Sequence, residues 1–134
     1  MVSWYLIERA CAVPISAVPT FIAEATRNVH AAAPGLPIVI VAHLGDGNVH
    51  FIRFFSFEQW KNVADPDTFA EQIRSIINQT AVALGGTFSA EHGIGRTLVG
   101  DMARYKSAIE LSMMRTIKQA LDPNNLFNPG RLLP

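Results

Sequence analysis

Residues 43–50, HLGDGNVH, place a tight turn between two apolar runs and constrain the fold more than any other stretch. The run LPIVIVA comes before the segment, FIRFF comes after it, and Asp46-Gly47 is a strong signal for a β-hairpin. With these two residues at the centre of the turn, His43 faces His50, and directly opposed residues have Cβ atoms roughly 4.5–5.5 Å apart. The hairpin therefore predicts two imidazoles that can bind one metal ion. The alternative is a pair of polar residues bonded to backbone or water.

The elements around this hairpin predict the order β-α-β-β-α-β. The expected elements are a strand over residues 4–13, a helix from Ser16 to Pro34-Gly35, strands over residues 37–44 and 49–55, a helix from Asp65 or Asp67 to Gly85-Gly86, and a short strand over residues 87–90. Apolar residues recur at steps of three and four in both helices, and the two middle strands are apolar enough to predict burial on both faces. This order indicates an α+β, ferredoxin-like antiparallel sheet covered by two helices.

The end of the chain predicts a loop followed by a C-terminal helical segment. Residues 91–96, EHGIGR, form a glycine-spaced loop, residues 98–104 a short helical turn, and residues 106–121 a longer helix. The tail carries apolar side chains that need a surface to cover them, and that surface can belong to a segment or partner outside these residues. Left uncovered, such apolar surface predicts a homo-oligomer. The apolar side chains are Leu126, Phe127, Leu132 and Leu133. We expect one domain over residues 1–134, with a ferredoxin-like unit over 1–90 and the active-site loop and C-terminal helices over 91–134.

Charge and cysteine content limit the possible partners. Eleven basic and eleven acidic residues cancel, so nothing indicates a nucleic-acid partner. Cys11 is the only cysteine, which excludes an intrachain disulfide and a thiolate metal cluster and favours a cytoplasmic setting. No apolar run reaches the 18 residues of a transmembrane helix. The start lacks a basic leader, so we expect no signal peptide and interpret the chain as beginning partway into a larger protein.

Glu91 and His92 stand side by side after the last predicted strand, followed by glycines that let backbone approach a ligand. Adjacent side chains on extended backbone point in opposite directions, so the two residues are expected to have different tasks. Two histidines and a carboxylate commonly bind a divalent metal that keeps positions open for substrate, and Glu91 can complete such a set with His43 and His50. His92 would then be an acid or base. The alternative is a loop salt bridge or a hydrogen-bonded turn.

Three motifs, in this order, resemble the C-terminal domain of FAD-linked oxidases of the vanillyl-alcohol-oxidase type. They are HLGDGNVH, GGTFSAEHGIGR and the closing LDPNNLFNPGRLL, and together they span residues 43–133. The family contains flavoproteins such as D-lactate dehydrogenase, the glycolate oxidase flavin subunit and D-2-hydroxyglutarate dehydrogenase. The resemblance implies a 2-hydroxy acid substrate whose hydride passes to FAD.

The same resemblance implies a role for each motif residue. In metal-dependent members, which use zinc or manganese, two histidines and a glutamate hold the ion, which implies metal binding by His43, His50 and Glu91. It also implies that His92 is the base and that Asn128 contacts the flavin cofactor. The family's N-terminal FAD-binding domain is absent from these residues. We therefore expect that domain, or a separate subunit, as a partner of this chain. We also expect the isolated chain to be inactive.

Two further observations bear on the substrate. Ile52 stands where the 2-hydroxyglutarate branch of the family tends to carry an asparagine that helps to hold the distal carboxylate, which favours lactate or another substrate without a second acid group. Arg53 and Arg96 can pair with a carboxylate, and the alternative for each is a solvated surface charge. The competing function is a non-catalytic ferredoxin-like module that binds a metal or small ligand, or that dimerises.

Overall fold

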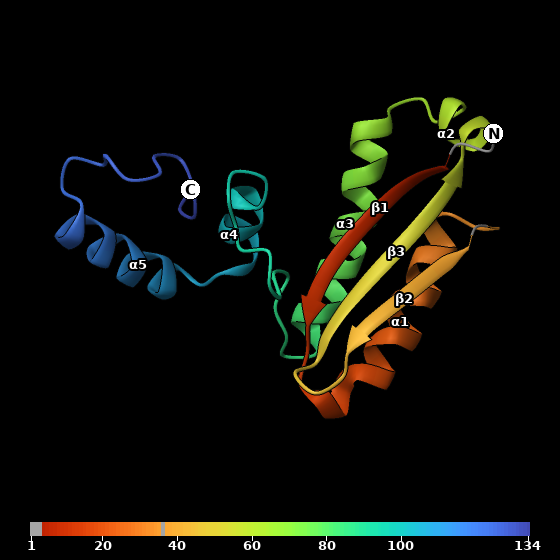
Figure 1. Ribbon diagram of the computed structural model, residues 1–134, viewed down its shortest axis with the longest axis horizontal. Helices are drawn as coiled ribbons and strands as arrows, with labels where there is room; N and C mark the ends of the chain where they lie inside the picture. Colours follow the sequence, from red (N-terminus) through yellow and green to blue (C-terminus); the bar gives the residue numbers. More distant parts are fainter. Residues whose placement is uncertain (1–3, 36) are drawn as a thin grey trace. The chain divides into compact units, whose positions relative to one another are not determined.

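The computed structural model describes residues 4–35 and 37–134; residues 1–3 and 36 lie outside the described part (Figure 1). The chain divides into two compact units, Met1–Glu91 and His92–Pro134.

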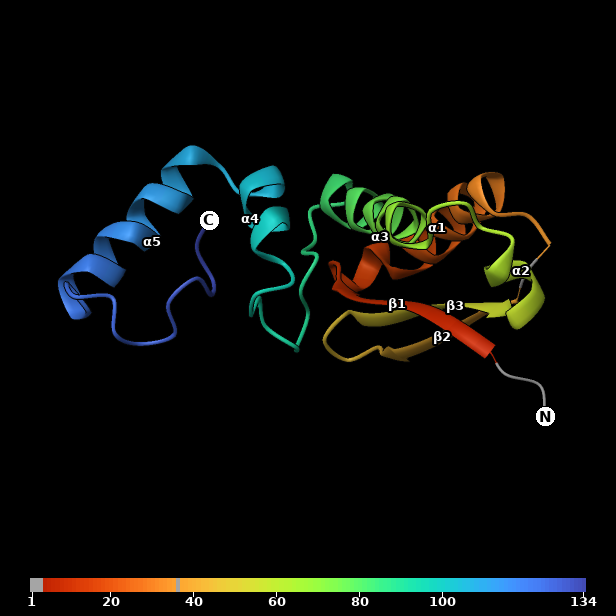
Figure 2. The same cartoon turned by 90° about the horizontal axis from the view of Figure 1, so that it is seen from above.

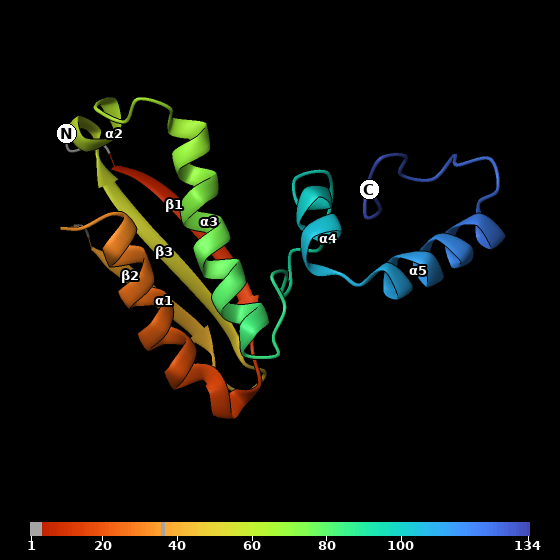
Figure 3. The same cartoon turned by 180° about the vertical axis from the view of Figure 1, so that it is seen from behind.

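The first unit is an antiparallel sheet with helices on one face. Its strands are β1 (Trp4–Ala12), β2 (Ile38–His43) and β3 (Asn48–Ser56), in the order β1-β3-β2. The helices are η1 (Ile15–Ala17), α1 (Val18–Ala32), α2 (Phe57–Lys61) and α3 (Pro66–Ala83). Figures 2 and 3 show α1 and α3 crossing the same face of the sheet. The predicted α+β class and antiparallel sheet are confirmed.

The core lies between the sheet and these two helices. Its fully buried side chains include Phe21 and Val29 from α1, Ile73 and Ile77 from α3, and Val49, Phe51 and Phe55 from β3. Burial of aliphatic and aromatic side chains at this interface is the main favourable term in folding. Arg53 is buried in the same row of β3 and donates a hydrogen bond to the Ala33 carbonyl oxygen. Arg53 is therefore neither a surface charge nor accessible to a substrate, whereas Arg96 is exposed.

The predicted burial of β2 and β3 on both faces is wrong. Side chains of β2 alternate between half-buried and exposed, and Val39 and Val41 are exposed. Trp4 and Leu6 of β1 are exposed as well, and the pairing register places them on the same face. Within the described residues of the first unit, helices cover only one face of the sheet, which a continuous apolar run in the sequence does not reveal. We call the uncovered side the open face.

The predicted fourth strand is wrong in extent, because residues 87–90 form only an isolated bridge between Thr87 and Ala12. The two residues exchange hydrogen bonds of 3.1 and 2.7 Å, and the Ala90 N–H then donates to the Ala10 oxygen at 3.2 Å. Between the two contacts, β1 advances by two residues, from Ala12 to Ala10, whereas the segment after α3 advances by three, from Thr87 to Ala90. The extra residue breaks the ladder as a bulge does.

The two-residue hairpin turn is also wrong. His43 pairs with Asn48, so residues 44–47 form the loop between β2 and β3. The Asp46 carboxylate accepts a 3.1 Å hydrogen bond from the Asn48 N–H, an arrangement in which an aspartate closes its own turn. The Val13 N–H donates to the Gly47 oxygen at 3.1 Å and ties the loop to the chain after β1.

Replacing Gly47 with alanine is expected to lower the free energy of unfolding by about 2–4 kcal/mol. Gly47 has φ +72°, and a Cβ there would lie 2.0 Å from the Val13 oxygen. Gly45→Ala is the matched control, because nothing lies within 4 Å of its Cβ position and its φ is not positive. Urea unfolding of both variants measures the difference, and equal midpoints would contradict the clash.

The second unit contains α4 (Val99–Tyr105) and α5 (Ala108–Leu121), which confirms the two predicted helical segments. Ser107 begins α5 with a capping box, in which its hydroxyl and the Glu110 side chain each bond the other's backbone N–H. The Asp122 carboxylate accepts hydrogen bonds from Lys118 and from the N–H groups of Leu126 and Phe127, which holds the tail after α5. Apolar side chains at steps of four along α5 are exposed: Ile109, Met113, Ile117 and Leu121.

Within residues 4–35 and 37–134, every helix is too short or too polar to span a bilayer.

Candidate functional site

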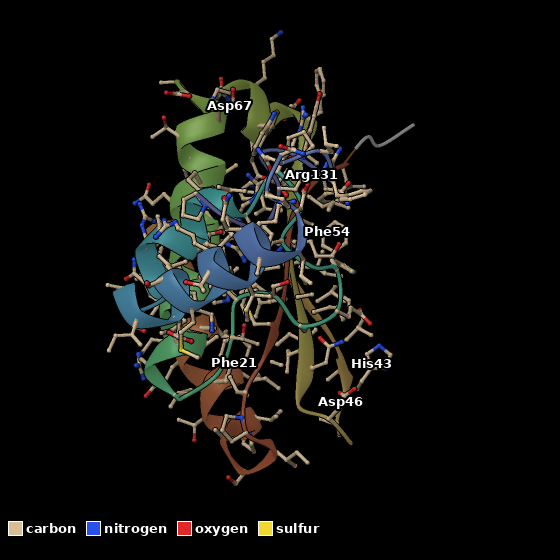
Figure 4. The ribbon with its side chains drawn as sticks, turned by 90° about the vertical axis from the view of Figure 1, so that its left-hand side faces the viewer. Phe21, His43, Asp46, Phe54, Asp67 and Arg131 are labelled. Atoms are coloured by element: carbon tan, nitrogen blue, oxygen red, sulfur yellow. The ribbon has the colours of Figure 1, made fainter. Side chains whose placement is uncertain are left out.

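Three predicted residues come together at the hairpin end of the sheet. His43 ends β2, His50 lies in β3, and Glu91 follows the segment that bridges to β1. Their candidate ligand atoms all lie within 4.8 Å of one another, and the two imidazole centroids are 5.8 Å apart. Figure 4 shows His43 beside Asp46 at the hairpin. The predicted proximity of these side chains is confirmed, although the predicted strand register is not.

The altered register keeps both histidines on one face. Asn48 is directly opposite His43, and His50 is two residues farther along β3, so His43 and His50 are diagonal neighbours. Side chains alternate between faces with a period of two, and a shift by two residues therefore preserves the face. Diagonal neighbours have Cα atoms roughly 7–8 Å apart, within reach of long side chains.

Glu91 reaches the histidines through the edge of β1. Ala10 is the register partner of His50, and its carbonyl oxygen accepts the Ala90 N–H at 3.2 Å. This hydrogen bond holds Ala90, the residue before Glu91, next to Ala10, which is paired with His50 across β1 and β3. The Glu91 Oε1 atom lies 2.7 Å from His50 Nε2.

Both ring nitrogens of His50 contact carboxylates. Glu8 Oε1 lies 2.8 Å from Nδ1, on the other side of the ring from Glu91. The hydrogen bond with Glu8 raises the pKa of His50 above its ordinary value, burial of the ring opposes this, and Glu91 raises it further. The His50 side chain is only 14% exposed, whereas that of Glu91 is 45% exposed.

Asn48 is a site residue that the sequence interpretation missed. Its side chain is buried, and its hydrogen bond to Glu91 is the largest cause of the lowered pKa of that carboxyl group, with His50 and His43 adding to the effect. Because a carboxylate only accepts, the Asn48 amide donates this bond. Asn48 and Glu8 were detectable only from the strand register, which places both residues on the open face.

The donor set fits a divalent ion. Zinc binds histidine nitrogen and carboxylate oxygen at about 2.0–2.2 Å, so ligand atoms around one ion lie roughly 3–4 Å apart. The candidate ligand atoms here lie within 4.8 Å of one another, which is slightly wider than that range. His43 and Glu91 are exposed while His50 is half-buried, so an ion there would keep a solvent-facing side for a further ligand.

Among the described residues, the group of possible metal ligands does not include His92. His92 is the exposed first residue of the second unit. Asn128 is exposed with φ +50° and lines a pocket of about 440 Å³ in that unit. The other lining residues are Gly95, Lys118, Phe127, Arg131, Leu132 and Leu133.

Comparison with known proteins places this chain beside flavin enzymes. The family described as "FAD linked oxidases, C-terminal domain" matches residues 3–132. The chain is 37% identical over 128 residues to D-2-hydroxyglutarate dehydrogenase of Xanthomonas citri pv. viticola, a match that covers 90% of the chain and 25% of the relative. It is 35% identical over 101 residues to glycolate oxidase subunit GlcD of Escherichia coli, covering 74% of the chain and 19% of the relative.

A third relative is the mitochondrial D-lactate dehydrogenase [cytochrome] of Arabidopsis thaliana. It is 31% identical over 125 residues, covering 91% of the chain and 20% of the relative. The chain thus spans a quarter or less of the length of these three proteins.

Proposed function

The chain belongs to the family of C-terminal domains of FAD linked oxidases, and from this membership we propose that it is the substrate- and metal-binding part of a flavin-dependent 2-hydroxy-acid dehydrogenase. The observation that carries the proposal is the convergence of His43, His50 and Glu91 on one point of the open face. All three relatives described above are named for the oxidation of a small 2-hydroxy acid.

In this proposal the chain's own residues bind an ion and orient the substrate. His43, His50 and Glu91 hold zinc or manganese, and the hydrogen bond from Asn48 favours the ionised form of the Glu91 carboxyl group by lowering its pKa. The ion's chemistry there is to polarise the hydroxyl and carboxylate oxygens of the substrate. His92 removes the hydroxyl proton as general base.

The redox partner in this proposal is FAD. When bound, FAD, held mainly by an N-terminal domain or subunit, would supply the acceptor for the hydride from the substrate α-carbon. The hydroxy acid thereby loses one proton and one hydride and becomes a 2-oxo acid. Asn128 is the proposed flavin contact, and the isolated chain is proposed to be inactive.

Three finer proposals concern the chain itself. We propose that the first unit has a ferredoxin-like arrangement in which the segment of the Ala12–Thr87 bridge takes the place of the fourth strand. The apolar side chains exposed on α5 and in the tail favour self-association of the chain made alone. A cytoplasmic location remains our proposal from cysteine content, although the Arabidopsis relative is named as mitochondrial.

The substrate proposal depends on Ile52. This half-buried side chain lies two residues beyond His50 in β3, on the same face, with Glu8 and Val39 as register partners. An apolar group beside the proposed metal cannot pair with a second carboxylate, and burying a charge against it is costly. Lactate or glycolate therefore suits this position better than 2-hydroxyglutarate.

The test joins this chain to an N-terminal flavin domain and measures oxidation of D-lactate, glycolate and D-2-hydroxyglutarate with an artificial acceptor. We expect the best substrate to lack a second acid group, and Ile52→Asn to improve kcat/KM for D-2-hydroxyglutarate relative to it by about tenfold. Ile52→Val is the matched control, since it keeps an apolar side chain. A loaded, folded enzyme that oxidises none of the three would favour the non-catalytic module.

A further inference from the structure

Glu8 stands where it can control the orientation of His50. Its register partner in β3 is Ile52, and the neighbouring pair on the same face is Ala10 with His50. Glu8 is thus a diagonal neighbour of His50 across β1 and β3, which brings its Oε1 atom to 2.8 Å from Nδ1. The Glu8 side chain is 37% exposed and the His50 side chain 14%.

The contact matters because a neutral imidazole carries one N–H and one lone pair. A carboxylate at Nδ1 accepts the N–H there, and this leaves the Nε2 lone pair for a metal. Nε2 is the atom that faces Glu91, at 2.7 Å, so the ligand-facing nitrogen and the nitrogen held by Glu8 are different atoms. Histidines that bind metals characteristically donate their second ring N–H to such a partner, which sets both the tautomer and the ring angle.

We propose that Glu8 is a positioning residue that holds His50 with Nε2 toward a divalent cation bound by His43, His50 and Glu91. The inference rests on the proposed metal site and adds to it a residue outside the three motifs. Glu8 lies in β1, on the opposite side of β3 from His43, so the support comes from a different strand than the other histidine ligand.

A purely structural role for the same contact makes a different prediction. If Glu8 served only as an ion-pair partner that stabilises the sheet, its removal would lower stability and leave metal affinity unchanged. If it acted only through its negative charge, Glu8→Gln would lose as much metal affinity as Glu8→Ala, and if the net charge of the chain alone mattered, removal of another exposed glutamate would have a similar effect. Glu71 supplies that control, because it is an exposed glutamate on α3, away from the open face.

The experiment titrates zinc and manganese separately into the full chain and its variants by calorimetry, with circular dichroism as a check on folding. We expect Glu8→Ala to weaken affinity about 10- to 100-fold. Glu8→Gln is expected to lose less, because its amide oxygen still accepts from Nδ1–H. Glu71→Ala is expected to match the parent chain. Parent-like affinity in folded Glu8→Ala, or an equal loss in Glu71→Ala, would overturn the proposal.

A second readout needs no variant. Long-range ¹H–¹⁵N NMR spectra of the zinc-loaded parent chain are expected to show His50 with a protonated Nδ1 and a metal-bound Nε2, and metal on Nδ1 would overturn the role of Glu8. The His43→Ala/His50→Ala chain separates this inference from the function it rests on. If the double variant still binds the ion with parent affinity, the proposed metal site is wrong. If the double variant loses binding while Glu8→Ala retains parent affinity, the metal site stands and the positioning role of Glu8 is wrong.

Discussion

Zinc or manganese binding is expected to weaken more than about 100-fold when His43 and His50 are both replaced with alanine. The double change removes two of the three side chains whose ligand atoms lie within 4.8 Å of one another and leaves Glu91 as a single carboxylate. Loss of a residue that merely supports a ligand already costs about 10- to 100-fold, so loss of two ligands should exceed that. Calorimetric titration of the full chain with each metal measures the effect.

His30→Ala is the matched control for this experiment. His30 lies exposed in the last turn of α1 and is not a member of the cluster, so this variant should bind as the parent chain does. Equal affinity in the parent, the His30 variant and the double variant would exclude the metal site. Equal loss in the two variants would show that binding depends on histidines in general and would exclude it too.

The proximity of the three proposed ligands could be predicted from the sequence even though the hairpin register was wrong. The expected pair was His43 with His50, and the observed pair is His43 with Asn48. The two registers differ by two residues along β3, an even number, so both place the histidines on one face. A slip of one residue would have sent His50 into the core, where Val49 and Phe51 pack.

The supporting residues could not be predicted, because they depend on pairings between segments far apart in the chain. In the sequence, Glu8 is only a polar residue within an apolar strand, and the β1–β3 register is needed to place it next to His50. In the sequence, Asn48 follows Asp46-Gly47 and resembles a turn residue. Its place in β3, opposite His43, is known only once the loop is seen to span residues 44–47. The open face was hidden for a similar reason, since apolar side chains such as Val39 and Val41 are exposed there and resemble core residues in sequence.

If the proposed function holds, replacing His92 with alanine in the chain joined to an N-terminal flavin domain is expected to lower kcat by about 10²- to 10⁴-fold while leaving bound metal and FAD unchanged. The expectation follows from dividing two tasks between neighbouring residues: Glu91 lies within the ligand cluster, whereas His92 does not. General-base removal accounts for a loss of this size, and a residue that holds no metal should not alter metal content. Turnover is measured with the best 2-hydroxy acid, and metal by elemental analysis of the same sample.

Glu91→Gln in the same protein is the contrasting variant, because it is expected to change metal content, which His92→Ala is not. This change keeps the shape of the side chain and removes the charge, so it should lower metal content along with turnover. His92→Gln serves as a second variant of the proposed base, because it retains hydrogen-bonding capacity but cannot accept a proton at neutral pH. If His92→Ala loses metal in proportion to activity, His92 is a ligand and the division of roles is reversed. If both His92 variants turn over at the parent rate, the proton must leave by another group.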